Sequence, residues 1–170
     1  MSQLSKHQRE TLLAALPKLR RFCLSMTGSA ADADDLLQTT VERLLARGIG
    51  ADVDPIRWAY RVCKNIWIDE LRSKEVRTRM SWKVGDDTDT AHNADDVLDA
   101  TQRAERLQKA MAELPDEQRM VLALVAIEGR SYAETAEILD IPAGTVMSRL
   151  ARARAALAAR MHSEESDGHD

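Results

Sequence analysis

Arginine and hydroxyl side chains gather near the carboxyl end of the chain, in GTVMSRLARARAAL (144–157). If this stretch is helical, its large aliphatic residues lie on one side and its polar residues on the opposite side. Arginine binds guanine edges and phosphates, and hydroxyls bind either, so this is the chemistry of a major-groove reader. An ordinary solvated basic face is the alternative. The residues that we expect to contact DNA are Thr145, Ser148, Arg149, Arg152 and Arg154.

The residues before this stretch complete a helix-turn-helix. Ser131 and Glu134 form an S-x-x-E capping box, which predicts a helix start at 131. Asp140 occupies the turn, where a left-handed backbone is usual and aspartate is tolerated at a cost of about 1 kcal/mol. No acid occurs in 143–161. The capped first helix, the turn and the acid-free second helix together favour DNA binding over the solvated face.

A second polar group lies on a helix predicted at 29–47, which Ser29 begins and Gly48 ends. Its aliphatic residues, Leu44 and Leu45 among them, recur at helical spacing on one face. The opposite face is either a solvated surface with acids that favour the helix start or a docking face for a basic partner. That face presents Asp34, Asp35, Gln38 and Glu42.

A third group follows Asp54-Pro55, a strong helix-start signal. Trp58, Tyr60 and Trp67 are interleaved there with basic side chains, although aromatics are only 4% of the chain. Basic residues follow phosphates, and planar groups and amides suit unstacked bases, but at least one tryptophan is expected in the core. The DNA-contacting candidates are Arg57, Arg61, Lys64, Asn65, Asp69 and Arg72.

The elements that position these groups are helical. The chain has 170 residues with 44% hydrophobic residues, 7 glycines and 4 prolines, and no alternating strand pattern, so we predict an all-α fold. We expect two small helical domains at 1–80 and 104–161, joined by a flexible acidic linker at 81–103 and followed by a disordered tail at 162–170. Apolar periodicity with helix-start and stop signals marks the domains, and turn-prone acidic composition marks the linker.

Charge is segregated along the chain, whose formal net charge is -4. Residues 55–83 hold eight Lys/Arg and three acids, whereas 84–105 hold seven acids and one Arg. DNA responds to local potential, because salt screens fields beyond about 10 Å. Net acidity therefore does not exclude nucleic-acid binding.

The cysteines and the apolar runs of the sequence narrow the class of protein. Cys23 and Cys63 have no nearby partner in sequence, so buried small side chains are favoured over a redox or zinc role. No apolar run reaches the roughly 20 residues that span a bilayer and no signal-peptide core is present, so we expect a cytoplasmic protein without membrane insertion. We expect no cofactor, no metal and no catalytic residue.

The motifs together resemble bacterial sigma factors of the extracytoplasmic-function (ECF) group. The resemblance rests on DADDLLQTTVERLL (32–45), WAYRVCKNIWIDELR (58–72), LPDEQRMVL (114–122) and the helix-turn-helix at 129–157, in that order along the chain. It implies that 1–80 is sigma region 2 and 104–161 is sigma region 4. The implied function is an alternative sigma factor that directs core RNA polymerase to promoters of a stress or envelope response.

The resemblance also implies roles for the candidate residues. The acidic set on 29–47 would dock on the clamp helices of the largest polymerase subunit, and region 4 would meet the flap. The set on 55–72 would open and read the minus-ten element, and the loop 48–54 would capture a flipped base. The arginine set on 143–161 would read the minus-thirty-five element. A dedicated anti-sigma factor is a further implied partner.

The sequence departs from the family pattern at three positions. Met147 stands where Lys or Arg is usual, Asp140 where Gly is common, and Thr39 where an acid is frequent. We therefore expect the promoter sequence that this protein recognises, and its contact with polymerase, to differ in detail from those typical of the family.

Two rival functions are also compatible with parts of the sequence. A stand-alone helix-turn-helix regulator would bind duplex DNA without polymerase, but it leaves the 29–74 group unexplained. A metal-dependent nuclease would use Asp32, Asp34 and Asp35, yet neighbouring residues on a helix diverge by about 100° each, so these carboxylates do not converge.

Overall fold

The computed structural model describes residues 3–80 and 99–167, and within these ranges it is helical without strands. The predicted all-α class is confirmed. The elements are α1 (Lys6–Thr27), α2 (Ala30–Arg47), α3 (Pro55–Met80), α4 (Asp99–Ala112), α5 (Asp116–Leu122), the π-helix η1 (Ala123–Ile127), α6 (Tyr132–Leu139) and α7 (Ala143–Asp167).

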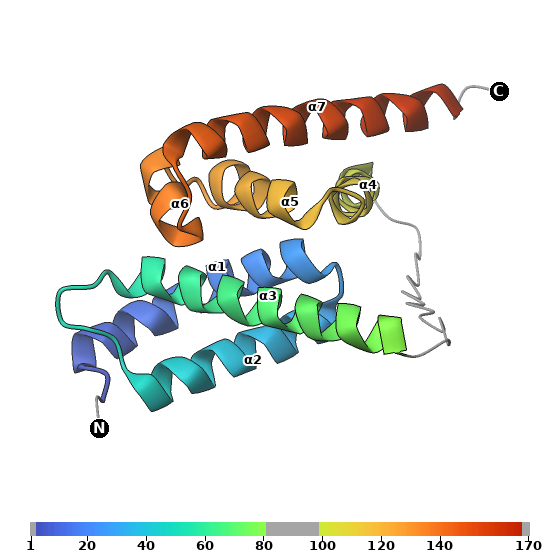
Figure 1. Cartoon of the computed structure of the whole chain (residues 1–170). Helices are drawn as coiled ribbons and strands as arrows, with labels where there is room; N and C mark the ends of the chain where they lie inside the picture. Colours follow the sequence, from blue (N-terminus) through green and yellow to red (C-terminus); the bar gives the residue numbers. More distant parts are fainter. Residues whose placement is uncertain (1–2, 81–98, 168–170) are drawn as a thin grey trace.

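Helices α1, α2 and α3 pack together as the N-terminal domain (Figure 1). Their ends follow local chemistry. The Ser29 hydroxyl accepts from the amide of Asp32, and the Asp54 carboxylate accepts from the amide of Ile56 at 2.9 Å. Gly28 and Gly48 end α1 and α2 with positive φ, where a side chain would be strained.

Helices α4 to α7 form the C-terminal domain. The Ser131 hydroxyl caps α6 by accepting from the amide of Glu134 at 3.1 Å. Asp140 then turns the chain with φ 56° and ψ 50°, so the left-handed turn predicted from the sequence is confirmed. Ile138, Val146 and Leu150 fill the helix-turn-helix core with at most 2% exposure.

The two domains lie against each other as two layers. Figure 1 shows α1, α2 and α3 in one layer and α4 to α7 in the other, with α6 over the beginning of α3. Buried side chains of both layers form one continuous core, in which Phe22 and Tyr60 of the first layer and Leu124 of the second are fully buried. The described residues therefore form a closed arrangement, in which the domains share an interface.

Several expectations about boundaries and burial differ from the structure. Of the predicted linker 81–103, residues 81–98 lie outside the described residues, and 99–103 begin α4. The helix α7 extends to Asp167, into the predicted tail, because the alanine-rich run before it favours helix. Leu45, expected on the core face of α2, is 54% exposed.

Cys23 and Cys63 are buried side by side between α1 and α3. Their Sγ atoms lie 3.4 Å apart, and both are free thiols. The contact with Cys23, followed by burial, raises the pKa of the Cys63 thiol well above its usual value. They fill the core as small apolar side chains, as expected.

Candidate polymerase and nucleic-acid surfaces

The acidic set of α2 forms one exposed face. Asp34, Asp35, Gln38 and Glu42 are all exposed and lie along one side of the helix. Gln38 Nε2 donates to Glu42 Oε1 at 3.2 Å, and Arg20 of α1 holds Asp34 at 2.8 Å. This face therefore combines negative charge with side chains that are partly held in place. Leu45 lies one turn beyond Glu42 and adds an apolar contact point at its end.

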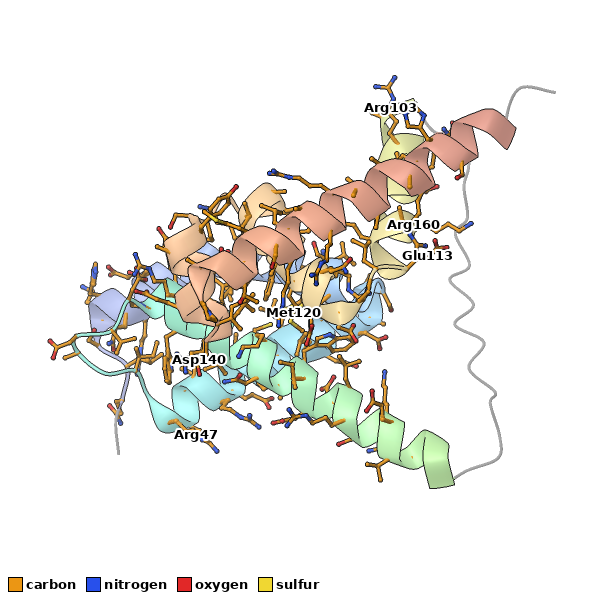
Figure 2. The ribbon with its side chains drawn as sticks, turned by 45° about the horizontal axis from the view of Figure 1, so that its top comes forward. Arg47, Arg103, Glu113, Met120, Asp140 and Arg160 are labelled. Atoms are coloured by element: carbon orange, nitrogen blue, oxygen red, sulfur yellow. The ribbon has the colours of Figure 1, made fainter. Side chains whose placement is uncertain are left out.

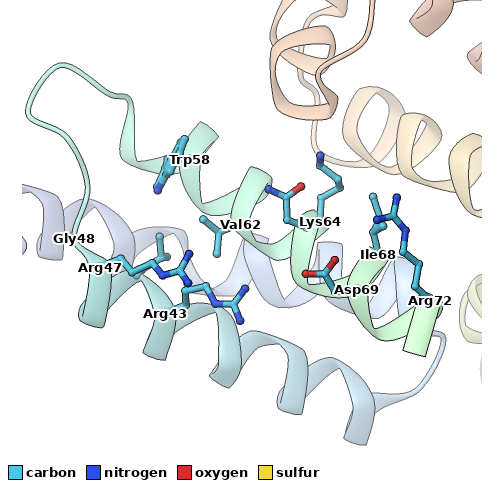
Figure 3. Close-up of a pocket in the computed structure, with 11 residues that line it drawn as sticks. Arg43, Arg47, Gly48, Trp58, Val62, Lys64, Ile68, Asp69 and Arg72 are labelled. Atoms are coloured by element: carbon cyan, nitrogen blue, oxygen red, sulfur yellow. The ribbon is translucent and has the colours of Figure 1, made fainter. Parts of the chain in front are cut away.

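A groove of about 660 Å³ runs between α2 and α3 (Figure 3). Four of the six predicted minus-ten residues line it. They are joined by an exposed tryptophan and by two arginines of α2 that point towards α3 in Figure 3. The predicted residues in the groove are Lys64, Asn65, Asp69 and Arg72, and the three additional ones are Trp58, Arg43 and Arg47.

Trp58 is the aromatic side chain that this groove presents. It is 37% exposed, and the Arg61 guanidinium lies 5.9 Å from its ring centre. Tyr60 is fully buried and Trp67 is 6% exposed. Of the three interleaved aromatics, Tyr60 and Trp67 therefore belong to the core, and Trp58 is the one that remains available for base stacking. The expectation that at least one tryptophan is core filler is confirmed.

The other two predicted minus-ten residues face α6 instead of the groove. Arg57 bonds Glu137 at 3.1 Å and lies 3.7 Å from Glu134. Arg61 donates to the Glu137 carbonyl at 3.4 Å and lies 3.9 Å from Asp140. Figure 2 shows Asp140 on the side of the C-terminal domain next to α3. Acidic residues of α6 thus occupy part of the basic surface of α3.

Lys64 lies between the two faces of α3 and is 7% exposed. Burial and then the neighbouring Arg61 lower its pKa, while Asp140 acts in the opposite direction. In Figure 3 the side chain points towards the C-terminal domain. The closed arrangement therefore withholds this ammonium group from solvent.

Glu128 makes a fully buried polar contact between the two domains. Its carboxylate, with 0% exposure, accepts two bonds of 2.9 Å from Arg21 and one of 3.0 Å from the Tyr60 hydroxyl. The Arg130 guanidinium lies 5.3 Å from the Tyr60 ring centre. Burial, followed by the charge of Glu128, raises the pKa of Tyr60.

Local backbone geometry aims Glu128 at α1 and α3. The π-helix η1 ends with the Glu128 amide bonded to the Ala123 carbonyl at 2.9 Å, and Gly129 then turns the chain at φ 68°. A π-turn adds a residue to the helical repeat and so rotates the side chains that follow. Sequence periodicity missed Glu128 for this reason.

The predicted minus-thirty-five residues separate into two groups on α7. Ser148, Arg152 and Arg154 are exposed, whereas Thr145 and Arg149 are half-buried. Arg149 lies 3.6 Å from the exposed carboxylate of Glu117 of α5. Three of the five predicted residues are therefore exposed, and the role of the set in DNA binding stays a prediction.

The acids that a metal-dependent nuclease would use do not form a metal site in the described residues. No group of three or more His, Cys, Asp or Glu in residues 3–80 and 99–167 could hold a metal ion, and Asp34 is paired with Arg20. None of the described helices combines the length and the apolar character needed to cross a membrane.

Comparisons with known proteins match both domains of the chain to one family. The family model described as Sigma-70 region 2 matches residues 12–77, and the one described as Sigma-70, region 4 matches residues 104–157. The chain is 31% identical to the ECF RNA polymerase sigma factor EcfG of Rhodopseudomonas palustris, over 91% of this chain and 84% of that protein. It is 33% identical to the ECF RNA polymerase sigma factor SigW of Bacillus subtilis, over 82% and 81%.

A solved structure resembles both layers at once. The sigma factor RpoE of Bartonella quintana, crystallised with the anti-sigma factor NepR, matches 93% of this chain and 98% of its own with a TM-score of 0.80 at 27% identity. A match over that length includes both domains, so the closed arrangement seen here resembles that of RpoE in its complex.

Proposed function

This chain belongs to the ECF RNA polymerase sigma factors, and we propose that it directs promoter-specific initiation through three surfaces: the α2 face, the α2–α3 groove and α7. It acts as a specificity subunit of core RNA polymerase, with no catalytic residue of its own. We place its action in the cytoplasm, with the polymerase and promoter DNA.

The groove between α2 and α3 is the observation that carries this proposal. It combines cationic side chains for phosphates, the amide of Asn65 for base edges and the exposed ring of Trp58 for stacking. Such a surface stabilises bases that have left the duplex, and this offsets a few kcal/mol of unstacking without ATP. The loop 48–54 joins α2 to α3 at one end of this groove, which Gly48 lines, and a flipped minus-ten base would enter there.

The acidic α2 face is proposed to bind the clamp helices of the largest polymerase subunit. Asp35 and Glu42 are exposed and available to basic partner residues, and electrostatic complementarity of this kind increases association rate and selectivity. Region 4 would meet the flap while α7 enters the major groove of the minus-thirty-five element. Ser148, Arg152 and Arg154 are its exposed polar residues there.

The closed arrangement must open before promoter DNA binds. Arg57 and Arg61 are engaged by α6, and a promoter reader needs the two domains apart to reach both elements. Since RpoE adopts a similar arrangement with NepR, we propose that an anti-sigma factor binds and holds this chain in the closed state. The regulated genes would then respond to the signal that releases it, as in a stress response.

Charge-reversal variants test whether the α2 face binds polymerase and α7 binds DNA. Asp35→Lys with Glu42→Lys should abolish binding to core polymerase and leave duplex binding by the isolated protein unchanged. Arg152→Glu should spare polymerase binding and abolish promoter-dependent transcription. Equal loss of both activities in either variant, with the helical circular dichroism unchanged, would contradict the assignment. Promoter-specific transcription stimulated without binding to core would favour the stand-alone regulator.

A further inference from the structure

The first turns of α7 present an apolar side chain that the fold does not use. Met147 is 54% exposed, whereas its neighbours Val146 and Leu150 are 0% and 2% exposed and fill the domain core. Gly144 and Ala151, which lie one turn before and after it, are exposed and too small to cover it. The thioether is therefore free to meet a partner in the groove that α7 is proposed to enter.

The polar side chains around Met147 are few. Ser148, Arg152 and Arg154 are the exposed polar residues of the predicted DNA-reading set, and the Ser148 hydroxyl donates to the Thr145 carbonyl at 3.1 Å. Arg149, also expected to read DNA, is half-buried and lies 3.6 Å from Glu117 of α5. Direct reading by the exposed residues of this stretch thus combines one hydroxyl, two guanidinium groups and one long thioether.

The chemistry of base edges selects what the thioether contacts. Each base pair presents donors and acceptors in the major groove, and only pairs with thymine also present a methyl group there. A polar edge set against Met147 would lose water hydrogen bonds without replacement. A methyl group has no such penalty and gains apolar contact.

We propose that Met147 contacts the 5-methyl group of one thymine, on either strand of the minus-thirty-five element, and makes promoter choice depend on that methyl. The inference rests on the proposed function, because it takes α7 as the minus-thirty-five reader. A duplex is favoured over a protein as the occupant, because residues 143–161 carry four arginines and no acid.

Thymine-to-deoxyuridine replacement tests the contact without changing any base pair. A promoter found by run-off selection is rebuilt with deoxyuridine at each minus-thirty-five thymine in turn, and transcription is measured with core polymerase and the full chain. Burial of one methyl group corresponds to about a fourfold effect. One position should therefore lose activity about fourfold with the unchanged protein and show no loss with Met147→Ala.

Two control variants sharpen the result. Met147→Leu keeps an apolar side chain and should keep the deoxyuridine effect. Leu13→Ala removes another exposed apolar residue, 66% exposed on α1 far along the chain from α7, and should also keep it. Met147 lies outside the core, so its variants should fold as judged by circular dichroism.

The remaining outcomes overturn the inference. A deoxyuridine effect that persists in Met147→Ala, or no effect at any position while transcription still requires this protein and core, overturns the methyl contact and leaves the proposed function standing. Loss of anti-sigma inhibition in Met147→Ala with an unchanged deoxyuridine response would assign the residue to a protein contact. Absence of any transcript that depends on this protein overturns the proposed function itself.

Discussion

Changing Glu128 to Gln is expected to weaken the contact between the two domains. The carboxylate is fully buried and accepts from Arg21 and from the Tyr60 hydroxyl, each at 2.9–3.0 Å. Glutamine keeps the size of the side chain but removes the charge and replaces one acceptor with a donor. It therefore tests the charged contact with little change in packing.

The magnitude follows from the exposure of the partners. A hydrogen bond to a charged group contributes about 1.5–3 kcal/mol when it is shielded from water. Arg21 is 51% exposed, so solvent reduces its share, whereas Tyr60 is buried. We expect a loss of about 1–2 kcal/mol in the closed state, which raises the ratio of open to closed molecules about 5- to 30-fold.

Small-angle X-ray scattering of the full chain measures this change directly. The Glu128→Gln protein should have a larger radius of gyration and should reach half-maximal transcription at a lower concentration of protein. Glu113→Gln is the matched control, because Glu113 pairs with Arg160 inside the C-terminal domain (Figure 2). An unchanged radius in Glu128→Gln, or an equal increase in Glu113→Gln, would refute the role of this contact.

Three further predictions address the groove, the interface and the turn. Trp58→Ala should reduce promoter opening about tenfold, since stacking contributes about 1–3 kcal/mol per base, whereas Trp58→Phe should retain most of the opening activity. Permanganate footprinting measures promoter opening by both variants, and opening equal to that of the unchanged protein in both would contradict a stacking role. The pKa of Tyr60 is raised above its ordinary value of about 10 while Glu128 accepts its hydrogen bond in the closed state. The neutral hydroxyl therefore stabilises the closed state fully below pH about 10, and this stabilisation is lost as the pH rises further. Scattering across pH should show opening in that alkaline range, which Tyr60→Phe should remove; an identical pH profile in that variant would argue against it. Asp140→Gly should relieve about 1 kcal/mol of left-handed backbone strain and raise the thermal midpoint by about 2–4 °C in calorimetry. The exposed 3.9 Å contact of Asp140 with Arg61, which the variant removes, contributes little. A lower midpoint in the variant would show that this contact outweighs the strain.

Local signals in the sequence predicted most helix ends. Ser29, Asp54 and Ser131 cap the helices that they were expected to begin, and Asp140 adopts the left-handed turn. Each of these features depends on a few neighbouring residues. Capping hydrogen bonds and turn preferences act over three or four positions and are therefore visible in sequence.

Features that depend on packing between distant helices were not predicted. Arg43 and Arg47 enter the groove from the end of α2, where their i, i+4 spacing was the signal that could have found them. Glu128 lies after a π-turn that shifts the helical repeat, so a period of 3.6 residues assigns it no partner. The engagement of Arg57 by Glu137, 80 positions away, requires the closed arrangement itself.

The central claim is that this chain directs RNA polymerase to promoters, and run-off transcription tests it most directly. A genomic fragment library is transcribed by core RNA polymerase with and without the protein. We predict defined transcripts only when both are present, with shared sequences upstream of their start sites. Duplex fragments shifted by the protein alone, with no transcript that depends on it, would contradict the account and leave a DNA-binding regulator that works without polymerase.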